Sequence, residues 1–412
     1  MKEMIRSKIL DVLSIVAFLQ EKCKKRNNQK IRVGFMCQYI PAWNKSLPVY
    51  NKLKNDDRFE VFLLCVPNRI ENRQLVNPDD LSNDTYDYFV EQGYSPVNTL
   101  VGKNEWLDLK ELNLDYVFFT RPYNAYMPKA YSSRRVSSYA KICVLLYAMT
   151  ITKSENIMIN IDFFRNVYCY FAETSFIAAI NRQQLKLTHK LGLQKTLCYG
   201  MPALEQILLD KEKEGTIWSF SKNKFRIMWT PRWTTDVKLG GSNFFVYRDA
   251  LLEYAEKKKD IDFLFRPHPL SFPNFIKTGE MTKEEVDNYR NKIDKMENVF
   301  LDEEKEYVST MWESSVLVSD LSGMMPEYFV TGKPIIFCGS NMYLEPAEHF
   351  AKILEGCYTV YNEKELFECI ERLKDGEDPL KAKRMQIIQE VFGSTLGNAS
   401  QHIVEELVKS RR

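Results

Sequence analysis

The sequence has few of the features that mark several common classes of protein. Its nine cysteines lie far apart, include no Cys-x-x-Cys pair and are odd in number, which does not suit a disulfide framework. We therefore predict reduced thiols, as in a cytoplasmic protein. Lysine and arginine exceed aspartate and glutamate by only two charges, so no strong positive field marks a nucleic-acid-binding protein. Any anion-binding site must be local.

Long apolar runs are also missing, because no segment reaches the length that a membrane-spanning helix needs. Residues 1–30 nevertheless carry apolar side chains at helical spacing, with lysine and arginine on either side. Asp11 interrupts the apolar stretch and no small-residue cleavage site follows it, so we do not expect a secretory signal. Two interpretations of this amphipathic helix stay open. It lies on the anionic inner face of the cell membrane, or it packs on the protein itself.

The rest of the composition is that of a globular protein, with 412 residues of which 45% are hydrophobic. This length favours two domains over one. From residue 31 onward, short β-rich runs alternate with helical stretches, as in parallel sheets covered by helices. We predict an α/β protein with two doubly wound, Rossmann-type domains and a ligand-binding cleft between them.

The predicted parts are an N-terminal helix (1–30), an acceptor-side domain (31–197), a donor-binding domain (198–396) and a C-terminal helix (397–412). Strands are predicted at residues 31–36, 59–66, 116–120, 142–147, 168–172, 226–230, 263–265, 316–319, 334–338 and 358–361. The boundary between the domains is placed where Gly200 and Pro202 interrupt both periodicities.

A stiff turn follows one predicted strand of the second domain. Residues 266–269 read Arg-Pro-His-Pro, and the two prolines fix the backbone that carries Arg266 and His268. A cation and an imidazole in constant positions suit the binding of a pyrophosphate or the protonation of a leaving phosphate. The alternative is a turn histidine beside an incidental arginine.

Two more polar turns follow strands of the same domain. At residues 319–323 (Ser-Asp-Leu-Ser-Gly), Asp320 or Ser322 can cap the next helix, and Gly323 lets a ligand approach the backbone. Glu327 lies one turn further, where its carboxylate could accept hydrogen bonds from ribose hydroxyls. A plain helix cap is the alternative.

The third turn contributes Thr230 and Arg232, which add a hydroxyl and a bidentate donor. Alternatively, Arg232 is a surface residue stacked between Trp229 and Trp233. Because the carboxyl ends of parallel strands share one edge of a sheet, we expect all three turns to converge.

The order of these motifs resembles the CDP-glycerol glycerophosphotransferase family of teichoic acid and capsule polymerases. The likeness spans residues 199–403 and rests on Trp-Thr-Pro-Arg-Trp (229–233), Arg-Pro-His-Pro (266–269), Ser-Asp-Leu-Ser-Gly (319–323) with Glu327, and Gly-Lys-Pro-Ile-Ile-Phe (332–337). It implies a GT-B-like fold that binds the donor in its second domain. In that case His268 contacts the donor phosphates, Ser322 and Gly323 cradle the pyrophosphate, and Glu327 holds the ribose.

The resemblance also implies that neither a metal nor another cofactor is needed. Asp260-Ile261-Asp262 looks like part of a metal site, but it leads into a predicted strand and lacks a nearby histidine or further carboxylate. We interpret it as structural.

The first domain departs from the family. The family carries a Trp-His-Gly-Thr-Pro stretch whose histidine suits deprotonation of the acceptor hydroxyl, whereas residues 145–150 here read Leu-Leu-Tyr-Ala-Met-Thr. Glu173 is our candidate for the catalytic base in place of this histidine. It could equally be an acidic residue that starts a helix. On the donor side, His268 is the catalytic candidate. Tyr39 and Trp43 offer aromatic faces for an acceptor sugar, or form a local packing pair.

The leading hypothesis is a transferase that moves glycerol phosphate, or a related polyol phosphate, from a CDP-linked donor to a surface glycan. Its expected partners are the activated donor, a polysaccharide or lipid-linked glycan and an anionic membrane surface at the cytoplasmic face, with no nucleic acid. One alternative is a GT-B glycosyltransferase that uses a nucleotide sugar. Another is an inactive binding component of a polysaccharide assembly complex, which the missing histidine would favour.

Overall fold

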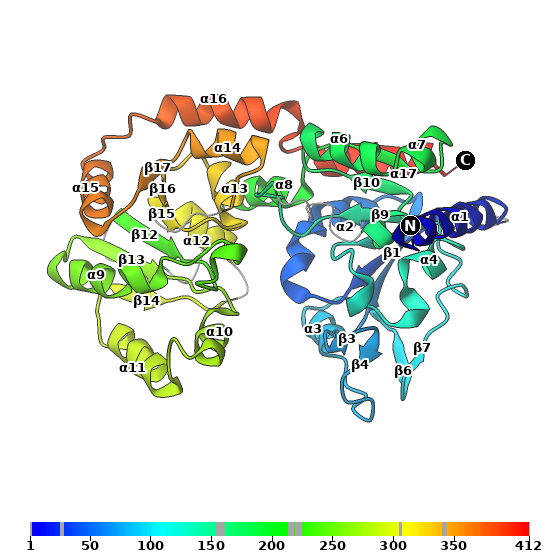
Figure 1. The fold of residues 1–412 in the computed structure, drawn as a ribbon, viewed down its shortest axis with the longest axis horizontal. Coiled ribbons are helices and arrows are strands. Elements are labelled where there is room, and N and C mark those ends of the chain that lie inside the picture. Colours follow the sequence, from blue (N-terminus) through cyan, green and yellow to red (C-terminus); the bar gives the residue numbers. More distant parts are fainter. Residues whose placement is uncertain are drawn as a thin grey trace. The chain divides into compact units, whose positions relative to one another are not determined.

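The computed structural model describes residues 2–24, 29–153, 161–212, 218, 225–304, 307–339 and 344–411. The chain forms two compact units (Figure 1). Unit 1 comprises Met1–Ala148, Glu155–Gln206 and Ser394–Arg412, and unit 2 comprises Met149–Ser154 and Ile207–Gly393. The chain therefore leaves unit 1 within a helix, α8 (Pro202–Leu209), rather than at residue 198 as the sequence predicted.

Unit 1 is built on a parallel sheet of seven strands in the order β11-β10-β9-β8-β1-β2-β5. Its strands are β1 (Ile31–Cys37), β2 (Phe59–Cys65), β5 (Val97–Asn98), β8 (Tyr116–Phe119), β9 (Lys141–Leu145), β10 (Cys169–Phe171) and β11 (Lys195–Leu197). Two small hairpins are added, β3 (Ile70–Glu71) with β4 (Gln74–Leu75), and β6 (Leu100–Gly102) with β7 (Glu105–Trp106). In chain order the sheet reads 3-2-1-4-5-6-7, which extends the Rossmann pattern by one strand.

Helices cover both faces of this sheet. The helices of unit 1 are α1 (Lys2–Lys22), α2 (Leu47–Lys54), α3 (Asp84–Glu91), α4 (Ser133–Val136), α5 (Ile161–Phe164), α6 (Ser175–Gln184), α7 (Lys186–Lys190) and α17 (Ala399–Lys409). Apolar side chains of α2 and α17 form the core on one face, and those of α4, α5 and α6 form it on the other. Because each strand is buried on both faces, the strands read as continuous apolar runs.

Unit 2 has a parallel sheet of six strands in the order β14-β13-β12-β15-β16-β17, the Rossmann order 3-2-1-4-5-6. Its strands are β12 (Phe225–Thr230), β13 (Ile261–Phe265), β14 (Val299–Leu301), β15 (Val316–Ser319), β16 (Ile335–Cys338) and β17 (Tyr358–Val360). Its helices are α9 (Phe244–Lys257), α10 (Ser271–Thr278), α11 (Lys283–Asp294), α12 (Val308–Glu313), α13 (Met324–Phe329), α14 (Glu348–Leu354), α15 (Glu363–Lys374) and α16 (Lys381–Val391). The predicted α/β class with two Rossmann-type domains is confirmed.

The C-terminal helix α17 belongs to unit 1 although the chain reaches it from unit 2. Ile403, Val404 and Leu407 are buried in the core of unit 1. The Tyr116 hydroxyl donates to the carbonyl of Leu407 at 2.8 Å, and the Lys195 ammonium lies 2.7 Å from the Glu406 carboxylate. The sequence predicted the helix, but its amphipathic pattern could not say which core it completes.

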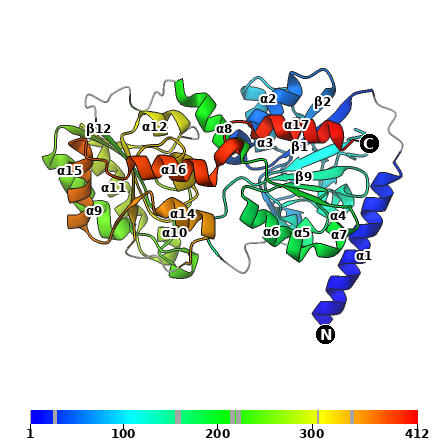
Figure 2. The ribbon, with the colours of Figure 1, turned by 90° about the horizontal axis from the view of Figure 1, so that it is seen from above.

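The N-terminal helix α1 lies along the outer side of unit 1 (Figure 2). Its buried side chains include Ser14, Ala17 and Phe18, and the Ser14 hydroxyl donates to Asn166 Oδ1 at 3.0 Å. Arg165 pairs with Asp11 and donates to the hydroxyl of Ser7 at 2.7 Å. Polar contacts therefore dock the helix on the protein, as one of the two interpretations predicted.

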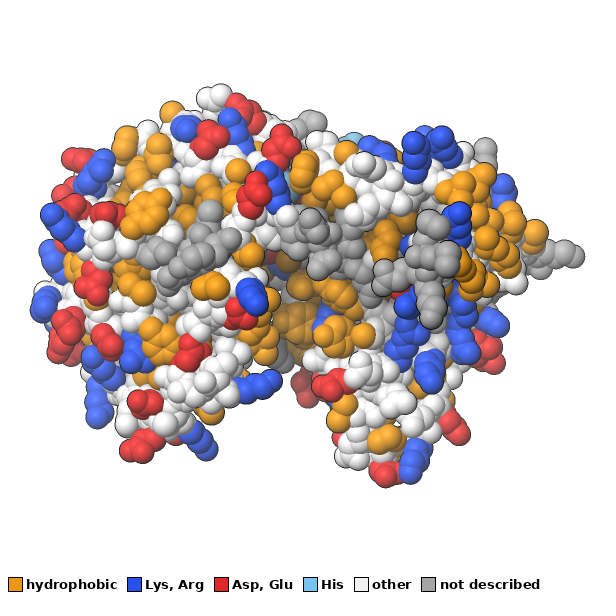
Figure 3. Space-filling view, in the orientation of Figure 1, with side chains coloured by type: hydrophobic (Ala, Val, Ile, Leu, Met, Phe, Trp, Pro, Cys, Tyr) orange, Lys and Arg blue, Asp and Glu red, His pale blue; other side chains and the backbone are white. Residues whose placement is uncertain are grey.

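The opposite face of α1 is apolar and exposed, with Ile9 55% and Val12 59% accessible. The remaining exposed side chains of this outer face of α1 are Ile5, Leu13, Val16 and Leu19. Figure 3 shows this apolar surface with lysine and arginine side chains gathered beside it. No helix among the described residues is long and apolar enough to cross a membrane.

Candidate functional site

The three predicted turns lie at one edge of the sheet of unit 2. They follow β12, β13 and β15, which are neighbours in the sheet. The direction of strand addition reverses between β12 and β15, and open α/β sheets bind their ligands outside the carboxyl ends of the strands at such a point. The turns therefore converge where the fold favours a ligand.

Asp320 is the central brace of this edge and is 1% exposed. Its carboxylate accepts hydrogen bonds from the backbone N–H of Arg232 at 2.7 Å, from the N–H of Asn243 at 3.0 Å and from the Asn243 side chain at 2.8 Å. We predicted that Asp320 caps a helix or contacts the donor. The structure instead directs its carboxylate into the protein, where it ties the turn after β12 to the start of α9.

Thr230 is also directed inward. Its hydroxyl donates to Ser319 Oγ at 2.9 Å, and Ser319 donates back to the carbonyl of Thr230 at 3.1 Å. The Ser319 hydroxyl also lies 3.0 Å from that of Ser322. Thr230 and Ser319 thus lock the ends of β12 and β15 together and position the loop that begins with Ser322.

Arg266 forms an internal ion pair rather than pointing into open space. Its guanidinium contacts the fully buried carboxylate of Asp302 at 2.5 Å and donates to the carbonyl of Glu304 at 2.6 Å. The guanidinium also lies over the ring of Tyr307, whose hydroxyl donates to Glu327 at 2.6 Å. This chain of contacts joins the turn after β13 to Glu327 on α13, so Arg266 acts as a brace and Glu327 is held in one orientation.

Open hydrogen-bond donors remain at the Ser322–Gly323 loop. Within the part of the chain that the structure describes, the backbone N–H groups of Ser322 and Gly323 have no hydrogen-bond partner. Both residues are partly exposed. Unpaired N–H groups at the carboxyl edge of a parallel sheet favour an anion.

Arg232 adds a cation at this loop. One terminal nitrogen of its guanidinium donates to the carbonyl of Leu321, and desolvation of the half-buried side chain lowers its pKa. A side chain at Gly240 would collide with Arg232, and Gly240 has a φ of 107° that suits glycine. Trp229 is part of the core and stacks on Phe244, so the alternative in which Arg232 is sandwiched between two tryptophans does not apply.

His268 completes the group of donors. The backbone N–H of Leu270 donates to its Nδ1 at 3.1 Å, so the proton of the neutral imidazole resides on Nε2. The residue is exposed, and the centre of its ring lies 6.4 Å from that of Trp233. Desolvation first, and then the charge of Arg232, hold the pKa of His268 well below its usual range. His268 therefore presents an N–H donor without carrying a charge.

This state of His268 can be tested by titration. In ¹H–¹⁵N NMR spectra of the free protein, we expect His268 to titrate well below the ordinary midpoint of about 6.5. Arg232→Gln should raise the midpoint, because it removes a nearby positive charge but not the desolvation. With only four histidines in the chain, His268→Ala assigns the signal. The described environment would be contradicted if His268 titrated at the ordinary midpoint and Arg232→Gln left that midpoint unchanged.

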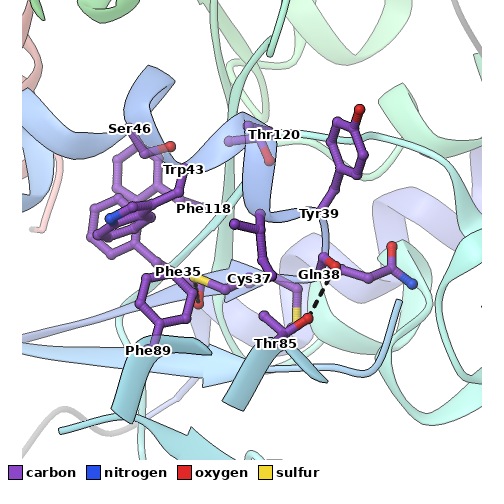
Figure 4. Close-up of a pocket in the computed structure, with 13 residues that line it drawn as sticks. Phe35, Cys37, Gln38, Tyr39, Trp43, Ser46, Thr85, Phe89, Phe118 and Thr120 are labelled. Carbon is purple, nitrogen blue, oxygen red and sulfur yellow. Dashed lines mark hydrogen bonds between the residues drawn. The ribbon is translucent and has the colours of Figure 1, made fainter. Parts of the chain in front are cut away.

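On unit 1, the two predicted acceptor residues, Tyr39 and Trp43, lie in different clusters. Trp43 packs edge-on against Tyr50 and Phe89 with centroid distances of 5.1 and 5.0 Å, within the aromatic core. Figure 4 shows Trp43 in this cluster and Tyr39 pointing away from it. The two rings are therefore not a packing pair, and Trp43 has a structural position.

Tyr39 instead belongs to a cluster around Arg121, a residue that the sequence analysis missed. The Arg121 guanidinium lies 4.9 Å from the ring centre of Tyr39 and 4.6 Å from that of Tyr126, and Tyr147 meets Tyr39 edge-on. No carboxylate pairs with Arg121 among the described residues. Arg121 comes directly after the run that forms β8, which is the same signal that identified the turns of unit 2.

Glu173 follows β10 and is 5% exposed. It accepts a hydrogen bond from the Tyr170 hydroxyl at 2.7 Å and lines a small pocket with Leu145 and Gly200. Because β8, β9 and β10 are adjacent parallel strands, Glu173 and Arg121 lie at the same edge of the sheet. No group of three or more metal-ligating side chains occurs in the described ranges.

Two Rossmann-type domains, one with a cluster of hydrogen-bond donors at its strand ends, give the chain a GT-B-like fold. The family model of the CDP-glycerol:poly(glycerophosphate) glycerophosphotransferases matches residues 178–409, which is more than half of the chain. The chain belongs to this family, as its motifs predicted.

Solved structures share the fold. A putative UDP-N-acetylglucosamine 2-epimerase from Listeria monocytogenes is 13% identical, with a TM-score of 0.62 over 92% of this chain and 96% of that one. UDP-GlcNAc 2-epimerase from Neisseria meningitidis, bound to UDP-GlcNAc, is 15% identical, with a TM-score of 0.61 over 92% and 100%. The wall teichoic acid polymerase TagF is 14% identical, with a TM-score of 0.59 over 99% and 95%. No curated protein matches the sequence.

Proposed function

We propose that the protein transfers glycerol phosphate from CDP-glycerol to a hydroxyl group of a wall or capsule glycan. The acceptor oxygen attacks the phosphorus that carries the glycerol, the new O–P bond forms, and the bond to CMP breaks. The acceptor proton passes to a base of the protein, and CMP leaves with the electron pair. The convergence of Arg232, His268 and the open N–H groups of the Ser322–Gly323 loop carries this proposal.

In this proposal, the donor phosphates lie against the Ser322–Gly323 loop. Arg232 and the Nε2–H of His268 stabilise the charge that develops on the departing CMP. Glu327, held by Tyr307, accepts hydrogen bonds from the ribose. Thr230, Arg266 and Asp320 keep these groups in place without contacting the donor. All these steps use backbone and side-chain groups of the protein, and none requires a cofactor.

Nucleotide release from a panel of donors tests the proposal. Purified protein is incubated with CDP-glycerol, CDP-ribitol and several UDP- and GDP-sugars in the presence of acceptor extracts. We expect CMP from CDP-glycerol. Release of UDP or GDP would instead identify a glycosyltransferase, and no release from any donor would favour an inactive binding component.

On the acceptor side, we propose Glu173 as the base and Arg121 as a contact for a phosphate of the acceptor. Glu173→Gln should lower kcat about a hundredfold with little change in KM, because it removes the base but keeps an acceptor for Tyr170. Arg121→Gln should raise KM for a phosphate-bearing acceptor about tenfold and leave kcat unchanged, as expected on losing a charged hydrogen bond. Steady-state kinetics separate the two effects. An unchanged kcat in Glu173→Gln would assign Glu173 a structural role.

We also propose that the protein works at the cytoplasmic face of the membrane, where the outer face of α1 enters the anionic lipid surface. The apolar stripe lies opposite the docked side of the helix, and Arg6, Lys8 and Lys22 accompany it. A helix of this kind lies in the plane of the interface. An acceptor anchored in the membrane by a lipid would then be within reach.

Replacing two exposed valines tests this placement. Val12→Ser with Val16→Ser should weaken binding to anionic vesicles by about tenfold or more, because less apolar surface leaves water. Stability should change by no more than about 0.5 kcal/mol, since both side chains are exposed. Val90→Ser with Val246→Ser is the matched control on other helices. Equal binding by both double variants would refute docking through α1.

A further inference from the structure

A recess on unit 1, between α1, α4 and α5, is lined by four arginines. Arg6 comes from α1, Arg73 from the β3–β4 turn, Arg134 from α4 and Arg165 from the residues just after α5. The recess has a volume of about 270 Å³. None of these residues belongs to the donor site or to the acceptor cluster around Arg121.

The base of the recess is a fixed polar network. Asn124, Ser133 and Asn166 are buried, with Asn166 donating to Ser133 Oγ at 3.0 Å and the N–H of Ser133 donating to Asn124 Oδ1 at 2.8 Å. Ser14 joins the network from α1 through Asn166. Because these groups bond to one another, the walls of the recess are held in place without a ligand.

Arg73 is held over the recess by a constrained backbone. Its φ is 68°, in the left-handed region that side chains other than glycine seldom adopt, and its N–H donates to the carbonyl of Ala125 at 2.8 Å. Such a conformation is strained and persists only where surrounding contacts impose it. The hydrogen bond to Ala125 fixes the tip of the hairpin and hence the position of the Arg73 side chain.

The charge of the recess is positive. Arg165 is neutralised by Asp11 and lies 3.6 Å from Asp162. No carboxylate pairs with Arg6, Arg73 or Arg134 in the described ranges. Asp162 also lines the recess, so four arginines stand against the two carboxylates of Asp11 and Asp162 and leave a net positive charge of two. The planar guanidinium suits a phosphate group better than it suits most other anions.

The position of the recess indicates where its phosphate comes from. Arg6 and Leu10 of α1 line it, and Arg6 lies three and seven residues before Ile9 and Leu13 of the exposed apolar face. That spacing places Arg6 at the margin of this face. A ligand in the recess would thus have its phosphate beside the arginines and an apolar part beside the outer face of α1.

We infer that the recess binds the headgroup phosphate of an anionic glycerophospholipid. The inference rests on the proposed membrane docking of α1 and makes it specific. α1 supplies apolar contact, and the recess selects lipids whose headgroup carries a net negative charge. The protein would therefore bind one phospholipid at a defined site in addition to its general attraction to an anionic surface.

Two pairs of substitutions test the inference. Arg73→Gln with Arg134→Gln removes two charges from the recess, and Lys110→Gln with Arg135→Gln removes two exposed charges elsewhere on unit 1. Binding is measured by sedimentation with vesicles of phosphatidylcholine containing phosphatidylglycerol. We expect about a tenfold loss for the recess variant and less than threefold for the control. Equal losses of vesicle binding in the two variants would mean that only general electrostatic attraction is involved, and would overturn the inference.

A soluble ligand tests the site without a membrane. Dihexanoyl phosphatidylglycerol, kept below its micelle concentration, should bind the full chain with one-to-one stoichiometry in calorimetry and should not bind the recess variant. Binding of poly(glycerol phosphate) oligomers there, with no binding of the lipid, would overturn the lipid assignment in favour of the polymer. CMP release with a soluble acceptor should be the same in the recess variant and the wild type. A loss of vesicle binding by Val12→Ser with Val16→Ser alone would support docking but refute the recess.

Discussion

His268→Ala should reduce CMP release from CDP-glycerol by about a hundred- to a thousandfold, which is the usual cost of removing one donor that stabilises developing charge. The loss should appear in kcat more than in KM for the donor, because the Nε2–H group matters most when negative charge grows on the leaving phosphate. Single-turnover measurements with saturating CDP-glycerol would report the chemical step directly.

The same variant should fold normally. His268 follows β13 in an exposed turn and makes one side-chain hydrogen bond, from Leu270, so the free energy of unfolding should change by about 1 kcal/mol or less. His402→Ala, which removes an exposed histidine from unit 1, serves as the control and should retain full activity. Collapse of the fold in His268→Ala would show that the imidazole is structural.

His268→Gln separates hydrogen bonding from proton transfer. Its amide can accept from the N–H of Leu270 and donate to a phosphate oxygen, but it cannot exchange a proton at neutral pH. If His268 acts as a hydrogen-bond donor, the glutamine should restore about tenfold of the activity that alanine loses. No recovery would mean that proton transfer by the imidazole is essential.

The sequence predicted where the three turns meet, but not which contacts each of their side chains makes. Turns after apolar runs had to meet at one edge of a parallel sheet, so the positions of Thr230, His268 and Ser322 followed from topology. Which side chains point inward could not be predicted, because the deciding partners are distant in the chain. Asp320 is engaged by Asn243, 77 residues away, and Arg266 by Asp302, 36 residues away.

The fold shows the same limit. The longer strands were predicted within a residue or two, because their apolar patterns are strong. The strands β5, β11 and β14 have only two or three residues each and left no pattern to read. For α1, the apolar periodicity left open whether the helix packs on the protein or lies on a membrane. Ser14 and Asp11 dock it by bonding to unit 1, whereas Ile9 and Val12 stay exposed.

Asp320→Ala should produce the largest loss of stability in unit 2. It removes the acceptor for three N–H donors, two on the backbone of Arg232 and Asn243 and one on the side chain of Asn243, which are then buried without partners. Each buried, unsatisfied donor costs about 1–3 kcal/mol, so the three donors together should cost at least about 3 kcal/mol. For a unit of this size, the midpoint of thermal unfolding should fall by roughly 10 °C.

The control is Asp236→Ala, which removes a nearby carboxylate that is exposed and bonds only to the backbone N–H of Lys238 among the described residues. Its midpoint should stay within about 2 °C of the wild type. Asp320→Asn keeps one oxygen as an acceptor, so its midpoint should lie between those of the two alanine variants.

The turnover of Asp320→Ala, measured at a temperature where it remains folded, should also drop, because the backbone of Arg232 is no longer held beside the Ser322–Gly323 loop. A folded Asp320→Ala protein with wild-type stability would show that the brace is dispensable. The donor groups would then have to be held in position by the strand ends alone, through the hydrogen bond between Thr230 and Ser319.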